Sequence, residues 1–283
     1  MEILLYIAVV LFAAAQSVAT KLYGKRNEDA ALFNALKAAS ALLLFSLLSV
    51  WQFSFHAPTL LYGLLYGVFF ALSMLAGYKA LLSGPMALTS MLVSFSVALP
   101  VLFGILFLRE TPTAFCILGL VSLLAAILLI GLGGKREAGK ERKPLWLAFV
   151  ALTFLANGAC SILQKWHQLL FPGAYLEEFM LFTMLPPVLF FFLWALAKNI
   201  RRLLKETKGL YLSALSGVAN GLSGYATLAL AGAQNASALF PAISAGTILM
   251  SLLCGMLIFK EKPRPPHLLA LLFGIAAVVL LKI

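Results

Sequence analysis

The chain has 283 residues, of which 63% are hydrophobic and 11% are charged, and its mean hydropathy is +1.01. This balance excludes an ordinary soluble domain. The net charge of +11 does not indicate a nucleic-acid-binding protein, because the basic residues lie in short segments beside long apolar runs, where anionic lipid head groups are the simpler partner.

Long apolar runs recur along the whole sequence and are separated by short polar segments that hold nearly all the charges. A helix needs roughly 20 apolar residues to cross the ~30 Å hydrocarbon layer of a bilayer. The sequence therefore predicts an all-α membrane protein with about ten transmembrane helices, which we place at 2–22, 30–53, 59–83, 86–108, 113–133, 145–165, 175–197, 209–232, 236–259 and 265–282.

The longest polar interruption, residues 134–144, is a basic linker that separates five predicted spans from the next five. It divides the chain into a first half at 1–133 and a second half at 145–283. The fourth span ends in LFLRETP (106–112), and the ninth ends in LIFKEKP (257–263), 151 residues later. A motif that returns at the same place in each half predicts an internal repeat.

Two glycine pairs also correspond between the halves. Gly63 and Gly67 lie in the third span, and Gly217 and Gly221 lie in the eighth, 154 residues later. Glycines at this spacing lie on one face of a helix and let a neighbouring backbone approach closely. Tight packing alone explains each pair, whereas the shared offset again indicates a repeat.

A repeat unit of five spans crosses the membrane an odd number of times, so its second copy must enter in the opposite direction. The sequence thus predicts two inverted five-helix repeats. This architecture is typical of carriers that work by alternating access, in which related halves expose one central site to either side in turn.

With these features the chain resembles the drug/metabolite transporter superfamily, in particular the ten-span carriers built from two EamA-type repeats. The likeness extends over nearly the whole chain and is strongest in two corresponding stretches. Their matching residues are Ala80, Gly84, Pro85, Pro100, Arg109 and Glu110 in the first half, and Phe240, Pro241, Gly246, Gly255, Phe259, Lys260 and Glu261 in the second. The resemblance implies inverted repeats around a central cavity, but it implies no particular cargo.

The basic residues are distributed unequally between the two sides of the predicted bundle. Seventeen of the 21 lysines and arginines lie in the loops that follow odd-numbered spans. The positive-inside rule places these loops in the cytoplasm and both termini outside. The resemblance implies the reverse, with both termini cytoplasmic, so the orientation stays open.

The chemistry-bearing residues do not form a catalytic or metal-binding pattern. The ten acidic residues lie at span ends or in loops, which argues against a multidrug pump that holds protons on a buried carboxylate. The histidines His56, His167 and His267 are scattered at span ends, and Glu177 and Glu178 are expected to favour the N-terminal dipole of the seventh span. We predict no metal, no cofactor and no enzymatic activity.

Lys37 is the most informative single residue, because it lies about two turns inside the second span. A central ammonium in the bilayer costs at least ~3 kcal/mol. Snorkelling to the interface is one explanation. The other is a role as a gate or as a cation that meets a substrate carboxylate or phosphate, and the resemblance favours it, since family members often carry an arginine at this place.

Further polar residues within spans complete the candidate substrate-binding set. A buried amide must form a bond between helices or face a wet cavity. Hydroxyl groups are weaker candidates, since they can bond their own helix backbone. The set comprises Lys37, Asn34, Gln16, Asn157, Asn220, Tyr78, Tyr225, Ser94 and Ser244.

The sequence therefore predicts a secondary transporter of a small polar metabolite, such as an amino acid or a related organic solute, in the plasma or inner membrane. Its expected partners are this solute and membrane lipids, with no nucleic acid. A monomer suffices for the architecture, and a dimer is an alternative. The competing hypotheses are a membrane-embedded lipid-processing enzyme and a non-transporting membrane scaffold.

Overall fold

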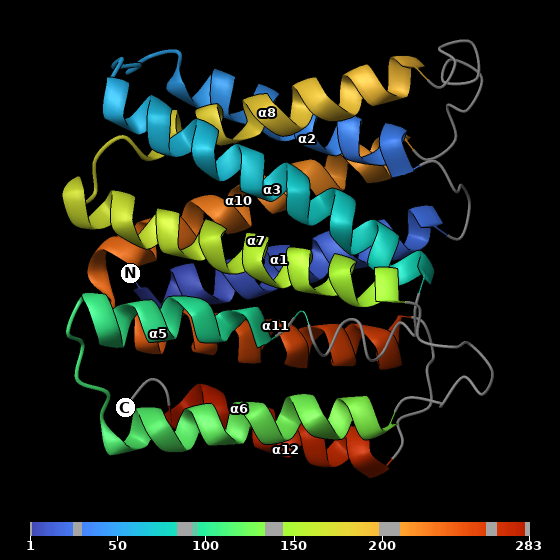
Figure 1. Cartoon of the computed structure of the whole chain (residues 1–283), viewed down its shortest axis with the longest axis vertical. Helices are drawn as coiled ribbons and strands as arrows, with labels where there is room; N and C mark the ends of the chain where they lie inside the picture. Colours follow the sequence, from blue (N-terminus) through green and yellow to red (C-terminus); the bar gives the residue numbers. More distant parts are fainter. Residues whose placement is uncertain are drawn as a thin grey trace. The chain divides into compact units, whose positions relative to one another are not determined.

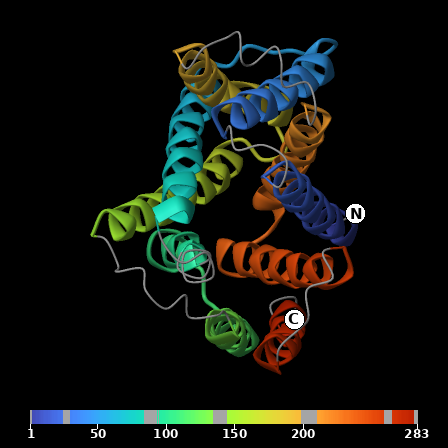
Figure 2. The same ribbon diagram turned by 90° about the vertical axis from the view of Figure 1, so that its right-hand side faces the viewer.

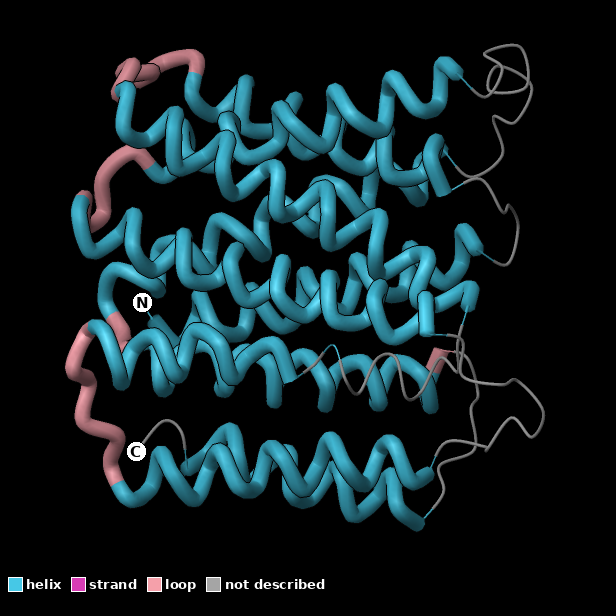
Figure 3. Tube along the Cα trace, in the orientation of Figure 1, coloured by secondary structure: helices cyan, strands magenta, loops and turns pink. Residues whose placement is uncertain are grey.

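The computed structural model describes residues 2–24, 30–83, 93, 95–133, 144–197, 210–258 and 265–280. All regular secondary structure in these ranges is helical, which confirms the predicted all-α fold for this part of the chain (Figure 3). The helices are α1 (Glu2–Gly24), α2 (Ala30–Ser49), α3 (Ala57–Ser83), η1 (Phe95–Val97), α5 (Ala98–Phe107), α6 (Ala114–Gly133), α7 (Pro144–Leu170), α8 (Leu176–Ala197), α10 (Leu210–Ala233), α11 (Ala236–Leu257) and α12 (Pro265–Leu280).

A described helix overlaps each of the ten predicted ranges, but two helix ends differ clearly from the prediction. Helix α2 ends at Ser49 rather than at 53, where the Ser49 hydroxyl donates to the Phe45 carbonyl at 2.7 Å and the chain turns. Helix α7 continues to Leu170 rather than ending at 165. The last turns of α7 carry buried polar side chains, so the apolar pattern in the sequence ends before the helix ends.

Five of these helices are long and apolar enough to cross a membrane. These segments are Glu2–Thr20, Ala31–Ser49, Ala57–Gly77, Leu145–Leu170 and Leu176–Ala197. Large apolar side chains also project outward from the helices, including Leu43, Leu47, Leu189 and Phe192. Such exposed surface is unfavourable in water and favourable in lipid. The chain is thus a helical membrane protein.

The described helices group into two compact units that do not coincide with the first and second halves of the sequence. Unit 1 contains Met1–Ala71 and Leu163–Gly232, and unit 2 contains Leu72–Ile162 and Ala233–Ile283. Each unit therefore combines helices from both predicted halves, and α3 and α7 contribute to both units.

Within unit 1, α2 lies against α8 (Figure 1). The glycine pairs are points of close helix approach, as predicted. A Cβ atom at Gly67 would lie 2.5 Å from the Thr183 carbonyl oxygen of α8, and one at Gly217 would overlap the Lys37 carbonyl oxygen of α2. Glycine is required where a backbone approaches this closely.

Within unit 2, α6 lies against α12, and α5 lies against α11 (Figure 2). Ala80 of α3 and Trp146 and Val150 of α7 form a small buried cluster. The unit is thus held by packing between helices that come from both halves of the chain.

Candidate functional site

A column of polar side chains lies between α1 and α10 in unit 1. Asn220 Nδ2 donates to Gln16 Oε1 at 3.0 Å, and Thr20 Oγ1 lies 3.4 Å from Ser216 Oγ. Ser223 Oγ donates to the Val9 carbonyl at 3.2 Å. Residues with higher numbers on α1 contact residues with lower numbers on α10, so the two helices run antiparallel. The structure therefore joins two predicted site residues, Gln16 and Asn220.

Lys37 lies on α2 in the same unit and is 7% exposed. No described residue accepts a hydrogen bond from its ammonium group or forms an ion pair with it. Ser213 of α10 is also fully buried, and its hydroxyl has no partner among the described residues. Buried polar groups are normally hydrogen-bonded, so both side chains require an explanation.

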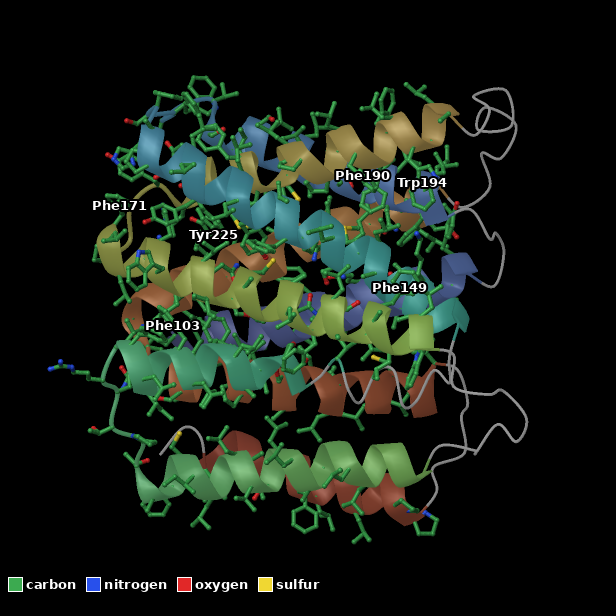
Figure 4. All side chains as sticks on the ribbon, viewed as in Figure 1. Phe103, Phe149, Phe171, Phe190, Trp194 and Tyr225 are labelled. Carbon is green, nitrogen blue, oxygen red and sulfur yellow. The ribbon has the colours of Figure 1, made fainter. Side chains whose placement is uncertain are left out.

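The remaining predicted site residues are distributed over both units. Ser73 Oγ donates to Asn157 Oδ1 in unit 2, while in unit 1 the hydroxyl of Tyr225, which is labelled in Figure 4, donates to Glu177 Oε1 at 2.7 Å. The Ser244 carbonyl accepts from Thr247 Oγ1 at 2.9 Å. Asn34 is half-buried on α2, the Tyr78 side chain is not described, and Ser94 lies outside the described residues.

A second polar cluster, which the sequence did not predict, joins the α2–α3 loop to the end of α7. We call it the histidine network, and it consists of His56, Thr59, His167 and Gln168. Thr59 Oγ1 lies 2.9 Å from His56 Nδ1 and 3.0 Å from His167 Nε2, while His167 Nδ1 lies 3.1 Å from Gln168 Nε2. Thr59, His167 and Gln168 are fully buried.

One backbone group fixes the direction of the hydrogen bonds that His167 makes in the histidine network. Gly173 N–H can only donate, and it lies 3.0 Å from Gln168 Oε1, so the Gln168 amide nitrogen is the donor to His167 Nδ1. His167 is then neutral and carries its proton on Nε2, which donates to Thr59. The Thr59 hydroxyl also lies within hydrogen-bond distance of His56 Nδ1. If His167 were protonated on both ring nitrogens, its Nδ1–H would face the amide N–H of Gln168, and both groups are donors. His167 therefore stays neutral and acts as a fixed structural link.

Aromatic rings enclose the histidine network at the turn between α7 and α8. The His56 ring stacks on Tyr175 with centroids 4.3 Å apart, and the ring of Phe171, which is labelled in Figure 4, meets it edge-on at 4.7 Å. Next to it, Lys165 Nζ donates to the Ala231 carbonyl at 3.0 Å, which places a cation at the C-terminal end of α10. The α2–α3 loop and the ends of α7 and α10 are thus fastened together.

Sequence patterns alone could not reveal this network, because Thr59 and His167 are 108 residues apart. One signal was available, since residues 164–168 read QKWHQ at the end of an apolar helix. Glu178 was expected only to favour the dipole of its helix. It also accepts the Ser54 backbone N–H at 2.9 Å and so fastens the same loop.

We expect Gln168→Met to lower the unfolding free energy by about 2–4 kcal/mol. The substitution leaves His167 Nδ1, Gly173 N–H and the Ala174 carbonyl without their partner, and each unsatisfied buried group costs about 1–3 kcal/mol. Thermal unfolding in detergent measures the effect. Gln52→Met, on an exposed position of the α2–α3 loop, is the matched control, and equal melting temperatures for the two variants would contradict the network.

In unit 2, Glu110 caps the beginning of α11. Its carboxylate accepts the Ala236 N–H at 2.8 Å, the Ser237 N–H at 2.9 Å and the Ser237 hydroxyl at 2.8 Å. The preceding residue, Arg109, has a positive φ of 54°, and Glu110 N–H donates to the Gly104 carbonyl, so the chain reverses here. A carboxylate is favourable at a helix N-terminus, where unsatisfied N–H groups gather.

Glu110→Ala is expected to destabilise the protein by about 2–3 kcal/mol, because it removes a charged cap together with three hydrogen bonds. Glu110→Gln retains one acceptor oxygen and should lose about half as much. Melting temperatures in detergent rank the three proteins. An unchanged melting temperature for Glu110→Ala would show that the cap does not contribute to the fold.

No group of three histidine, cysteine, aspartate or glutamate side chains within the described ranges is placed to hold a metal ion. The cysteines Cys116, Cys160 and Cys254 are free thiols. The polar column and the histidine network therefore offer neutral donors and acceptors, and Lys37 adds a buried cation.

Comparison with known proteins yields a structural likeness only. No protein-family model matches the chain, and no curated protein matches it. The solved structures include 28 similar chains. One of them, a crystal structure described simply as that of a protein, covers 98% of this chain and 94% of its own, with a TM-score of 0.74 and 17% sequence identity. At this identity the likeness shows a shared helical fold.

Proposed function

We propose that this protein is a secondary transporter that carries a small polar metabolite by alternating access. The observation that carries the proposal is the polar column between α1 and α10, in particular the Gln16–Asn220 pair. Apolar side chains would fill the interior of a membrane protein more favourably than amides, which cost several kcal/mol when unsatisfied. Gln16 and Asn220 are half-buried, and polar side chains that remain partly accessible inside a helical bundle are typical of a solute pathway.

The proposal includes ten spans arranged as two inverted five-helix repeats, as in the EamA-type carriers of the drug/metabolite transporter superfamily. The helix contacts support this arrangement. In two such repeats, α2 of the first half corresponds to α8 of the second half, and α3 corresponds to α10. The contact between α3 and α8 should then have a counterpart in a contact between α10 and α2. Gly63 indeed approaches Phe179 and Phe182, and Gly217 approaches Lys37 and Ser40.

The residue numbers at these two contacts keep constant offsets. The glycines are 154 residues apart, and their partners, Lys37 with Phe179 and Ser40 with Phe182, are both 142 residues apart. In the same pairing, α5 corresponds to α11 and α6 to α12, and each of these pairs is in contact. A two-fold axis relates the two copies of an inverted repeat, so equivalent helices beside this axis are expected to pack on each other.

Counterflow in proteoliposomes tests the proposal. Vesicles that contain the purified protein are loaded with an unlabelled solute, and uptake of the same labelled solute is followed for amino acids, organic acids and sugars. We expect at least one solute to accumulate transiently, because a carrier exchanges it across the bilayer. The absence of flux for every solute would contradict the proposal. Turnover of vesicle lipid would favour an enzyme, and neither activity would favour a scaffold.

A further inference from the structure

We infer that Lys37 and Ser213 bind an oxyanion group, a carboxylate or a phosphate, of the transported solute. This inference rests on the proposed transport function and narrows its substrate class to organic anions and zwitterions. The first observation is that both side chains are more than nine-tenths buried and have no hydrogen-bond partner among the described residues.

The packing of α2 against α10 places the side chains of Lys37 and Ser213 at the same height along the two helices. Phe33 shares a buried cluster with Leu212, and Ala41 and Phe45 lie against Gly221. Because residue numbers rise together on the two helices, α2 and α10 run parallel here.

Residues 33, 37, 41 and 45 form one face of α2, and this face meets α10. Lys37 lies midway between Phe33 and Ala41, opposite Gly217, whose missing side chain makes room for the Lys37 carbonyl. A helical side chain points toward the N-terminus of its helix, so the Lys37 ammonium extends about one turn in that direction. Ser213 precedes Gly217 by one turn of α10 and therefore lies at that height.

The electrostatics of this level favour an anion. Lys37 lies seven residues from the beginning of α2, and Ser213 lies three residues from the beginning of α10. Ser213 therefore lies in the first turn of α10, where the partial positive charge of the helix N-terminus adds to the positive charge of the lysine. The described parts of α1, α2 and α10 carry no carboxylate near this level, since Glu2 lies at the opposite end of α1.

The burial of Lys37 argues against snorkelling as its explanation. A snorkelling lysine keeps its ammonium in water or among head groups, whereas Lys37 is 7% exposed and its backbone carbonyl lies at the close contact of α2 with Gly217 of α10. A carboxylate between Lys37 and Ser213 would satisfy both groups at once, with a charge-assisted hydrogen bond from the ammonium and a second bond from the hydroxyl.

A ligand-dependent thermal shift tests the inference directly. The purified protein in a lipid-free maltoside detergent is titrated with pyruvate, succinate, alanine and inorganic phosphate, with glycerol as an uncharged control. We expect at least one of the charged solutes, but not glycerol, to raise the melting temperature, because binding to the folded state stabilises it. A parallel titration with phosphatidylglycerol distinguishes a lipid head group from a soluble anion.

Three substitutions and two matched controls assign the effect to these side chains. Lys37→Met should weaken the apparent affinity at least ~10-fold, and Ser213→Ala about 3- to 10-fold. Lys37→Arg should retain most of the binding. Lys79→Met on an exposed position and Ser46→Ala, whose hydroxyl bonds its own helix, should leave the affinity unchanged. Without ligand, Lys37→Met should melt at the wild-type temperature or higher.

Three results of the thermal-shift titrations would overturn the inference: no shift with any charged solute, a shift only with phosphatidylglycerol, or a shift that Lys37→Met leaves unaltered. The counterflow assay separates these failures from a failure of the transport proposal. Flux of uncharged solutes that is equal in wild type and Lys37→Met would overturn the anion site and leave the carrier standing. An anion-dependent shift without flux of any solute would overturn transport itself.

Discussion

Gly217→Ala is expected to lower the unfolding free energy by about 2 kcal/mol and to abolish transport. The added Cβ would overlap both the Ser40 hydroxyl and the Lys37 carbonyl oxygen, and the latter belongs to the backbone of α2 and cannot rotate away. Overpacking costs about 1–3 kcal/mol or more, while alanine regains about 1 kcal/mol of helix propensity relative to glycine. The helices α2 and α10 must then separate, and Lys37 moves with them.

Gly77→Ala is the matched control, since its Cβ would meet only the Thr153 side chain, at ordinary distances of 3.4 Å to Cγ2 and 3.8 Å to Oγ1. The gain in helix propensity should then raise the melting temperature slightly. Melting temperatures in detergent and counterflow rates in vesicles measure both variants. If Gly217→Ala and Gly77→Ala behaved alike, the close contact of α2 with α10 would be wrong.

Replacing Gln16 and Asn220 together by leucine is expected to reduce transport at least ~10-fold and to leave stability near that of the wild type. Each single leucine substitution orphans the other amide, which costs about 1–3 kcal/mol, whereas the double substitution replaces both partners by apolar groups. Stability should therefore recover in the double variant, and transport should not. Wild-type flux in the double variant would reduce the pair to a structural bond between helices.

The sequence predicts the helices of this protein well, because a membrane helix must satisfy its backbone internally and must be apolar over its whole length. It also predicts the close approaches at Gly67 and Gly217, since glycine at a four-residue spacing has a direct geometric meaning. The partners of these glycines were not predictable. The Lys37 carbonyl lies 180 residues away along the chain from Gly217, and no local pattern joins them.

The sequence predicted which residues belong to the candidate site, but it did not predict which of them contact one another. Gln16 and Asn220 were identified as buried amides, but their mutual hydrogen bond spans 204 residues of sequence. Tyr225 was predicted as part of a cavity lining, and no sequence pattern indicated that its hydroxyl donates to Glu177 at the start of α8. The histidine network escaped prediction because it joins a loop residue, a helix start and a helix end, and no periodic pattern marks such a junction.

The two compact units likewise could not be inferred from the order of the spans. The linker at 134–144 divides the sequence into halves, whereas the contacts group α1 and α2 with α8 and α10, and α5 and α6 with α11 and α12. If the two halves are inverted copies, this exchange is the expected outcome, because equivalent helices of the two copies pack together around a shared axis.

The most direct test of the transport account is whether the polar column opens to water from both sides of the membrane. In a variant without native cysteines, Ser216→Cys and Ser223→Cys place single thiols on the face of α10 that meets α1, and Leu43→Cys provides an outward-facing control. Proteoliposomes are treated on either side with a membrane-impermeant methanethiosulfonate.

We predict that both column thiols react with this reagent and that the control thiol does not. We also predict that a transported solute raises labelling of the column thiols from one side of the membrane and lowers it from the other. Column thiols as unreactive as the control from both sides would contradict alternating access through unit 1.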